Sequence, residues 1–287
     1  MTFIESVKGD ANKITLKKYG PPSPELLITD QNCINVTFLD TETTGLDRVN
    51  DQIIEMAIKT VRLEKSSGKI IAIEGSYESF NDPGEDISTE ITLLTGIENH
   101  MVDGESIKWE KVDDLLLESD LIIAHNASFD RAFVDRYSSI SSKKIWACSI
   151  NDIDWLARGF TNTKQELLCY WHGFYFDAHR AMSDVDALIN LLTFDSSEGD
   201  RTVVELIKNS LVPDYVIFAE HFKFDPIKKD ILKSNKYRWN PSDKIWFKKV
   251  NFDVLEHEKD WLTATIYDKD FKGRVEQINP IDKYKLL

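Results

Sequence analysis

The sequence has 287 residues, of which 42% are hydrophobic, and its formal net charge is −14. This length suffices for one full-sized domain with its own core and a smaller second unit. The first residues, MTFIESVKGDANK, lack the apolar core of a signal peptide, and runs such as LIIA are too short to cross a bilayer. The three cysteines form no CxxC pair, which favours reduced thiols over a disulfide framework or a zinc site. These features predict a cytoplasmic protein without a membrane partner.

The sequence of the N-terminal part predicts an irregular extension followed by a β-sheet. Residues 1–34 are expected to form a short helical or irregular extension, because KKYGPPSPELL contains three prolines. Residues 35–40, NVTFLD, have the pattern of a strand. The β-branched segments 51–61 and 69–80 are separated by EKSSG and predict an antiparallel hairpin that continues the sheet.

The next segments alternate between helical and strand patterns. Helices are predicted around residues 91–94 and over residues 106–119, where Ser106 is the expected N-cap. DLIIAHN, residues 120–126, is a short apolar strand that we expect to be buried on both faces. Further helices are expected over residues 128–137, 149–158, 163–171, 179–194 and 201–211. Strands followed by alternating strands and helices indicate a mixed α/β sheet with helices on its faces.

Pro213 marks the expected boundary between a main domain of residues 35–212 and a small α+β domain of residues 213–287. In the second domain, a helix is predicted over residues 226–234 and another over residues 255–267. Two short strands, KYRWN and KIWFKKV, are joined by the turn PSD.

Asp40 and Glu42 lie two residues apart at the end of the first predicted strand. Successive side chains of a strand alternate between its faces, so these two carboxylates share one face. Two carboxylates held this close repel each other and resist simultaneous ionisation. The pair therefore needs a partner that compensates its charge.

Two predicted helices each carry one further acid on a buried stripe. Asp130 and Asp184 are both followed by apolar residues three, four and seven positions later. Asp186 lies outside the apolar face of its predicted helix and is expected to face solvent. Taken alone, Asp130 also suits a helix N-terminus, where an acid interacts favourably with the helix dipole. The apolar residues are Phe133, Val134 and Tyr137 after the first acid and Ala187, Leu188 and Leu191 after the second.

Four carboxylates directed at the interior, without a matching row of lysines or arginines, predict a metal site. All-oxygen ligation favours Mg²⁺ or Mn²⁺ over zinc. Two divalent ions roughly 4 Å apart can hold a phosphodiester, activate water and stabilise the leaving oxygen. His179 lies five residues before Asp184, on the loop that enters the helix, where it suits the role of a general base.

The segments DTETTG, HNASFD and HRAMSD resemble the three exonuclease motifs of the DEDDh 3′–5′ exonucleases, a branch of the ribonuclease H-like superfamily. This family includes the proofreading subunit of bacterial replicative polymerase and ribonuclease T. The resemblance covers about residues 35–195 and implies a ribonuclease H-like mixed five-stranded sheet flanked by helices.

Carried over residue by residue, the resemblance also implies a set of functional residues. The metal ligands would be Asp40, Glu42, Asp130 and Asp184, and His179 would be the general base. The 3′-terminal nucleotide would be held by Thr43, Thr44 and Leu46, with Leu46 in apolar contact with a base. Asn126 in the second motif would help to position the site.

The second domain differs from the first in charge. Residues 215–287 carry 15 Lys and Arg against 12 Asp and Glu. Aromatic residues are interleaved with these cations, a composition that suits single-strand binding. Alternatively, Trp239 and Trp246 form the core of a very small domain and the lysines are its solvated rim. The aromatic residues are Phe222, Phe224, Tyr237, Trp239, Trp246 and Phe247.

These features together predict a 3′–5′ exonuclease that uses two Mg²⁺ or Mn²⁺ ions and releases nucleoside 5′-monophosphates. Single-stranded DNA is the favoured substrate, in repair or proofreading, and a proofreading role would need a separate DNA polymerase as partner. An exoribonuclease with the same chemistry is the first alternative. A catalytically silent nucleic-acid-binding or polymerase-associated module is the second, although every catalytic position of the motifs is intact.

Overall fold

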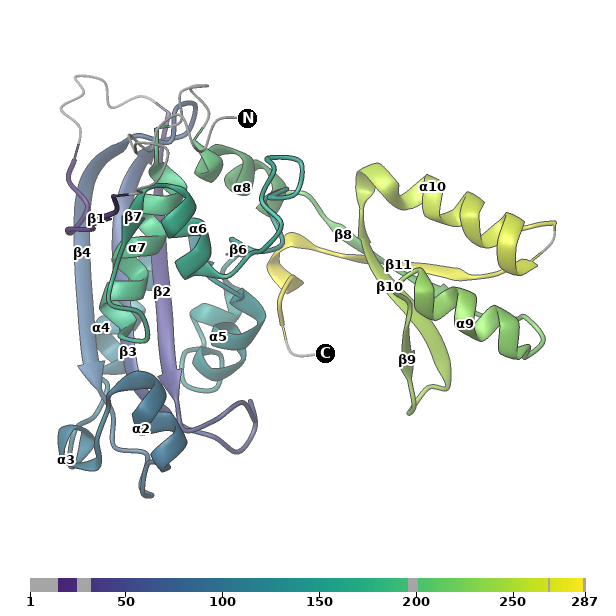
Figure 1. Ribbon diagram of the computed structural model, residues 1–287. Coiled ribbons are helices and arrows are strands. Elements are labelled where there is room, and N and C mark those ends of the chain that lie inside the picture. The colour runs from purple at the N-terminus through teal and green to yellow at the C-terminus, as the bar shows by residue number, and fades with distance from the viewer. Residues whose placement is uncertain (1–14, 25–31, 196–200, 268, 286–287) are drawn as a thin grey trace. The chain divides into compact units, whose positions relative to one another are not determined.

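The computed structural model describes residues 15–24, 32–195, 201–267 and 269–285 (Figure 1). The chain divides into two compact units, one comprising Met1–Ser210 and Tyr284–Leu287 and the other Leu211–Lys283. Much of the expected N-terminal extension, residues 1–14 and 25–31, lies outside the described residues. Within the described part of this extension, β1 (Lys17–Lys18) pairs in parallel with β7 (Phe174–Tyr175).

Five strands form the main sheet of the first unit. They are β2 (Cys33–Thr43), β3 (Ile53–Glu64), β4 (Ile70–Phe80), β5 (Leu121–Ala124) and β6 (Trp146–Cys148). Their order is β4-β3-β2-β5-β6, with β3 antiparallel to β2 and β4, and with β2, β5 and β6 parallel. The predicted mixed five-stranded sheet is therefore confirmed, and β2 is its middle strand.

Helices cover both faces of this sheet (Figure 1). On one face, α6 (Gln165–Trp171), α7 (Ala181–Thr193) and α8 (Thr202–Ser210) share a core cluster with Val36 and Phe38 of β2. On the other face, α4 (Trp109–Leu117) and α5 (Ala127–Val134) share a cluster with Leu39. Because strand side chains alternate, Asp40 and Glu42 lie on the same face as Val36 and Phe38, the face covered by α7. The shorter elements are α2 (Thr89–Thr95), α3 (Asn99–Val102) and the 3₁₀ turn Ser141–Lys143.

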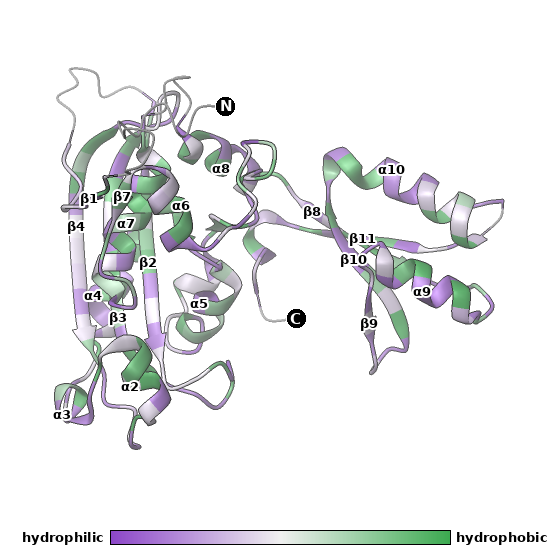
Figure 2. Ribbon diagram, in the orientation of Figure 1, coloured by the Kyte–Doolittle hydropathy of each residue, from purple (hydrophilic) through white to green (hydrophobic). Residues whose placement is uncertain are grey.

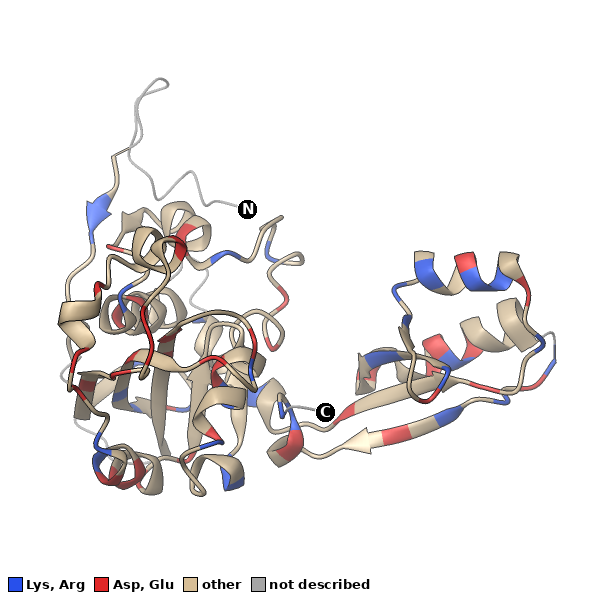
Figure 3. Ribbon diagram, turned by 90° about the horizontal axis from the view of Figure 1, so that it is seen from below, with Lys and Arg blue, Asp and Glu red and all other residues tan. Residues whose placement is uncertain are grey.

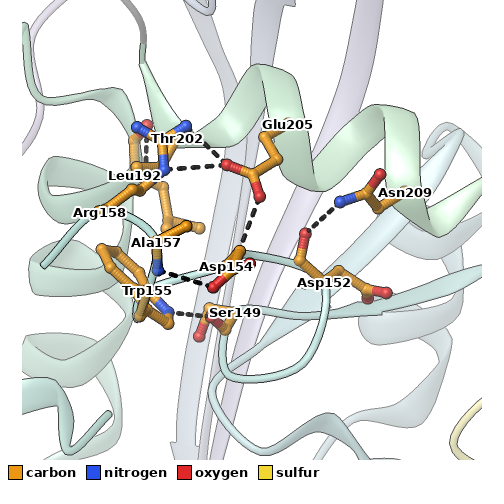
Figure 4. A network of polar contacts seen from close by, with 10 residues as sticks. All are labelled: Ser149, Asp152, Asp154, Trp155, Ala157, Arg158, Leu192, Thr202, Glu205 and Asn209. Carbon is orange, nitrogen blue, oxygen red and sulfur yellow. Dashed lines mark hydrogen bonds and ion pairs between the residues drawn. The ribbon is translucent and has the colours of Figure 1, made fainter. Parts of the chain in front are cut away.

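The predicted helix over residues 149–158 is wrong, because this segment is a series of turns. Side chains compete here with helical hydrogen bonding: Cys148 N donates to Asp152 Oδ2 at 2.8 Å, and Trp155 Nε1 donates to Ser149 O at 2.6 Å. Glu205 of α8 accepts from Asp154 N and from the Arg158 guanidinium (Figure 4). The segment is thus held by its contacts with α8 and by its own side chains.

Three single-residue expectations are also wrong. α4 begins after Lys108, whose ammonium donates to Ser106 Oγ at 2.9 Å, so Ser106 is not the N-cap. α5 ends at Val134, and Tyr137 is 44% exposed because it lies beyond the helix and stacks on Trp109. Asp186 does not face solvent, because it forms an ion pair with Lys59, whose buried ammonium needs a counter-charge.

The second unit contains a four-stranded antiparallel sheet and two helices. In chain order these are β8 (Asp214–Ala219), α9 (Pro226–Ser234), β9 (Arg238–Asn240), β10 (Ile245–Asn251), α10 (Phe252–Leu262) and β11 (Arg274–Ile278). A π-helical turn, Thr263–Tyr267, follows α10, and a 3₁₀ turn, Pro280–Asp282, follows β11. The strand order β11-β8-β10-β9 and the βαββαβ sequence define a ferredoxin-like arrangement. The predicted small α+β unit is confirmed, although β11 was not predicted from its polar sequence RVEQI.

The core of the second unit lies between its sheet and both helices. Ile217 of β8 and Trp246 of β10 pack there against Leu232 of α9 and Leu262 of α10. The alternative expectation for Trp246, a core residue of a small domain, is therefore correct. None of the described helices in either unit has the length and apolarity that a membrane span requires.

Candidate active site

The middle strand of the first unit changes from mostly apolar to polar residues at its C-terminal end. β2 is mostly apolar through Leu39, apart from Asn35 and Thr37, and becomes polar from Asp40 onward (Figure 2). Asp40 pairs with Ala57 of β3, and Glu42 pairs with Glu55, after which the register shifts at Thr43. The strand thus carries two acids on the α7 face at the point where regular pairing ends.

Asp184 in the first turn of α7 meets these two acids. One carboxylate oxygen each from Asp40, Glu42 and Asp184 lies within 4.8 Å of the other two. Among the described residues, no ion pair involves any of the three, although other acids of the same unit have such partners. Lys59 pairs with Asp186, and Arg180 pairs with Glu55 at 2.9 Å. An all-oxygen set of this kind without a paired cation fits the predicted Mg²⁺ or Mn²⁺.

Asp130 approaches the same strand from α5 but is bound to the residue between the two strand acids. Its Oδ1 accepts hydrogen bonds from Thr41 N at 3.0 Å and from Thr41 Oγ1 at 2.9 Å. The carboxylate is 2% exposed, and its charge contributes to the raised pKa of Asp40. Asp130 therefore lies beside the cluster of Asp40, Glu42 and Asp184 but outside the 4.8 Å group.

Burial raises the pKa of all four acids. It raises the pKa of Glu42 to about 8, with further contributions from Asp184 and other neighbouring carboxylates. The pKa values of Asp130 and Asp184 rise to about 7, again chiefly through burial. The pKa of Asp40 is raised well above its ordinary value by burial and then by its acidic neighbours. Four ionised carboxylates are therefore unfavourable in this site without a compensating cation.

The start of α7 is held by two carboxylates. Asp184 Oδ2 accepts a hydrogen bond from Arg180 N at 3.1 Å. Glu55 of β3 accepts from Ala181 N at 3.0 Å and from two nitrogens of the Arg180 guanidinium. These bonds satisfy backbone donors at the helix start and fix the turn that precedes it. His179, half-buried and in the left-handed region with φ of 64°, lies in that turn.

Glu55 and Arg180 were not predicted as site residues. The signal for Glu55 in the sequence is a lone acid within the apolar run IIEMAI. A buried acid in such a strand needs a partner, but the partner is separated from it by 125 residues in the chain. Only the folded structure brings the two together.

The loop after β2 contains the residues expected to hold a nucleotide. Thr43 is buried and donates through Oγ1 to Gly45 O at 2.6 Å, whereas Leu46 is 84% exposed. Thr44 Oγ1 accepts from Gln52 N at 3.0 Å. A Cβ at Gly45 would lie 2.5 Å from Asp51 Oδ2, so a larger residue there would displace the Asp51 side chain, which accepts from Asp47 N. The loop is thus ordered by its own polar contacts and leaves the apolar side chains of Leu46 and Val49 uncovered.

Asn126 belongs to the second motif, HNASFD, and lies directly before α5. Its backbone adopts the left-handed conformation with φ of 69°, which asparagine tolerates better than most residues. Its side chain is exposed and makes no capping bond with α5.

A mixed five-stranded sheet between two helical layers, with carboxylates meeting at the end of its middle strand, is a ribonuclease H-like arrangement. The family model described as Exonuclease (RNase_T) matches residues 37–192, more than half of the chain. The chain therefore belongs to this exonuclease family. This match confirms the predicted resemblance to an exonuclease family and the predicted class of enzyme, an exonuclease. The matched range includes every site residue predicted from the sequence.

Curated relatives are much longer than this chain. A DNA polymerase III PolC-type from Listeria innocua serovar 6a is 32% identical over 160 residues, covering 52% of this chain and 10% of the relative. The same enzyme type from Thermotoga petrophila is 33% identical over 130 residues, covering 44% and 8%. The chain thus matches about a tenth of the length of these relatives.

Solved structures with a similar fold include other exonucleases. A full-length 3′-exonuclease is 17% identical with a TM-score of 0.47, covering 62% of this chain and 65% of that chain. Exonuclease X in complex with 5′ overhanging duplex DNA is 21% identical with a TM-score of 0.40, covering 59% and 99%.

We expect the stability of the cation-free protein to fall as pH rises from about 5.5 to about 8. The folded-state pKa values of Glu42, Asp130 and Asp184 lie near 7 to 8. The unfolded-state values lie near 4, so the folded state binds more protons across this window and loses stability as they dissociate. Thermal melts in EDTA over this pH range measure the effect, and added Mg²⁺ should stabilise more at pH 8 than at pH 5.5.

Asp40→Asn is the matched control, because it removes one buried charge and preserves shape. Without cations, this variant should melt at least about 3 °C above the wild type at pH 8. The difference should shrink toward pH 5.5. A variant no more stable than the wild type at pH 8 would contradict the proposed charge repulsion.

Glu55→Ala should destabilise the protein by about 1.5–3 kcal/mol, because it removes the acceptor of hydrogen bonds from a guanidinium and a helix-start N–H. Urea denaturation measures this loss. Glu74→Ala on β4, where the glutamate is exposed, should change stability by less than about 0.5 kcal/mol. Equal effects of the two substitutions would show that Glu55 does not hold α7.

Proposed function

We propose that the first unit hydrolyses phosphodiester bonds at the 3′ end of a nucleic-acid strand and releases nucleoside 5′-monophosphates. The observation that carries this proposal is the meeting of Asp40, Glu42 and Asp184 without a paired cation, in a chain of the exonuclease family. A phosphodiester substrate brings its own negative charge, so only a site loaded with cations can accept it beside these acids.

Asp40, Glu42 and Asp184, with Asp130 beside them, would hold two divalent cations, Mg²⁺ or Mn²⁺. When bound, these ions neutralise the carboxylates, orient the scissile phosphate and stabilise the charge that develops on the leaving oxygen. The raised pKa values of the acids support this assignment, since protons and cations compete for the same oxygens.

His179 would act as the general base. An imidazole nitrogen takes a proton from the attacking water, the water oxygen bonds to phosphorus, and the bond from phosphorus to the 3′ oxygen breaks. The leaving oxygen then takes up a proton. The position of His179 in the turn held by Asp184 and Glu55 supports this role, because the same bonds that orient Asp184 also orient the histidine turn.

The terminal nucleotide would lie against the loop after β2. Thr43 and Thr44 would contact it through backbone and side-chain groups, and Leu46 would pack against its base. The high exposure of Leu46 supports this role, because a large apolar side chain gains most from being covered by a ligand. Asn126 would position the strand from the start of α5.

DNA is the favoured substrate, because the curated relatives are DNA polymerases of the PolC type. The names of these relatives also favour a role in proofreading or repair. In that role the protein would act in the cytoplasm together with a DNA polymerase. An exoribonuclease would use the same residues, so DNA and RNA oligonucleotides are compared directly in the experiment below. A catalytically silent module is less favoured, since Asp40, Glu42, Asp130, Asp184 and His179 are all present.

The wild-type protein with Mg²⁺ or Mn²⁺ should shorten 5′-labelled single-stranded oligonucleotides progressively and release label from 3′-labelled ones as mononucleotide. EDTA or Asp184→Asn should abolish both, because the ligand set is then incomplete. DNA should be degraded faster than RNA of the same sequence. Release of mononucleotides from the 5′ end, or full activity in EDTA, would exclude the proposed chemistry.

His179→Ala should slow hydrolysis by about 10²–10⁴-fold, the usual contribution of a general base. Binding of Mn²⁺, followed by thermal stabilisation, should be unchanged. His100→Ala, which removes an exposed histidine of α3, should leave the rate unchanged. An unaltered rate in His179→Ala would remove this residue from the mechanism.

A further inference from the structure

Among the described residues of the second unit, no helix packs against one face of its sheet. Both α9 and α10 pack against the face that presents Ile217 of β8 and Trp246 of β10. Figure 3 shows the two helices of this unit on the same side of its strands. Because side chains alternate along a strand, Phe218 and Phe247 point away from the helices. We call this second face the open face of the unit.

Four residues form one row across the open face. Phe247 of β10 pairs with Phe218 of β8, and these strands are the two central ones of the sheet. Phe247 also pairs with Arg238 of β9, and Phe218 also pairs with Arg274 of β11. The row therefore reads Arg238, Phe247, Phe218, Arg274 from one edge of the sheet to the other, with both aromatic rings at its centre.

The two rings of this row are not part of the hydrophobic core. Phe218 and Phe247 are each half-buried, and neither belongs to the core cluster between sheet and helices. Their ring centroids are 6.4 Å apart and tilted by 37°. A pair of phenyl rings on an uncovered sheet face contributes less to stability than the same pair in a core, so packing alone does not account for it.

The arginines that flank the rings differ in their contacts. The Arg274 guanidinium lies over the Phe218 ring, 4.0 Å from its centroid, and pairs with Glu220 at 3.0 Å. No ion pair of the described residues involves Arg238, so its charge is available to a ligand. Lys249, also on this face, is neutralised by Asp214 at 2.7 Å. Arg274 also forms an ion pair with Glu276, so Arg238 is the one of these three cations without an ion pair among the described residues.

We propose that the open face binds single-stranded nucleic acid, with one base stacked on Phe247, a second on the Arg274 guanidinium that lies over Phe218, and a phosphate contacted by Arg238. Four-stranded sheets that recognise single-stranded RNA use aromatic side chains of the sheet in this way. Arg274 can take part in this stacking because guanidinium planes also stack on bases. The choice of a nucleic-acid strand rests on the function proposed for the first unit.

The residues that carry this inference differ from those expected from the sequence. Tyr237 and Trp246 lie in the core, and Trp239 packs on Trp246 on the helix side of the sheet. Of the six aromatic residues considered for binding, Phe247 is the one on the row. Phe218 was not among them, because only the register of β8 against β10 brings it beside Phe247.

Fluorescence anisotropy in EDTA tests the proposal. It measures binding of the full chain to labelled oligothymidylate and oligouridylate of about twelve nucleotides. Phe247→Ala should raise the Kd at least about fivefold, since one stacked base is lost. Phe247→Tyr should restore binding, because the aromatic face is retained. The thymidylate and uridylate arms show whether the face prefers DNA or RNA.

Phe252→Ala is the matched control, because this exposed ring at the start of α10 contacts Tyr215, which lies on the helix side of the sheet. It should leave the Kd unchanged. Equal losses in Phe247→Ala and Phe252→Ala, or no binding by the wild type, would overturn the proposal. Unchanged melting curves verify that the variants fold.

Arg238→Ala gives a second, independent measure. Loss of one phosphate contact should reduce the slope of log Kd against log salt concentration by about 0.7. An unchanged slope would remove Arg238 from the binding surface.

Hydrolysis of a dinucleotide with Mn²⁺ separates this inference from the function of the first unit. Phe247→Ala should leave that rate unchanged, because a dinucleotide is too short to need a second site. Binding that depends on Phe247 without any hydrolysis would contradict the proposed activity alone. Hydrolysis without such binding would contradict the open-face site alone.

Discussion

The mutual repulsion of buried carboxylates at the end of β2 is the constraint on which the first unit depends. Burial and neighbouring charge raise the pKa of each of these acids, so the cation-free site is under electrostatic strain. Two of these acids lie on the middle strand of the sheet. Helices cover both faces of this strand, and the packing around it opposes the repulsion. Packing energy from the surrounding core thus holds together charges that would separate in water.

The acids near the site differ in whether they have a fixed counter-charge. Glu55 is paired with Arg180, and Asp186 with Lys59. Asp40, Glu42 and Asp184 have no such ion pair among the described residues and are the proposed cation ligands. Asp184 also accepts a backbone hydrogen bond at the start of α7. One side chain therefore links the ligand cluster to the turn that carries His179.

The two proposed sites would bind a polyanion in different ways. The first collects oxygen ligands and would acquire positive charge only with bound cations, which suits chemistry at a phosphate. The second presents aromatic rings between arginines on an uncovered sheet face, which suits the bases of a strand.

Local patterns in the sequence determined the elements and the acids of the site, because strand alternation and helical spacing act over a few residues. They located β2, the β3–β4 hairpin, α7 and the inward direction of Asp184. Only tertiary structure decided which distant side chains meet. The pairing of Glu55 with Arg180, the bond from Thr41 to Asp130 and the row containing Phe218 all depend on register and packing between remote segments. The turns of residues 149–158 were missed for the same reason, since contacts with α8 outweigh the local helical pattern.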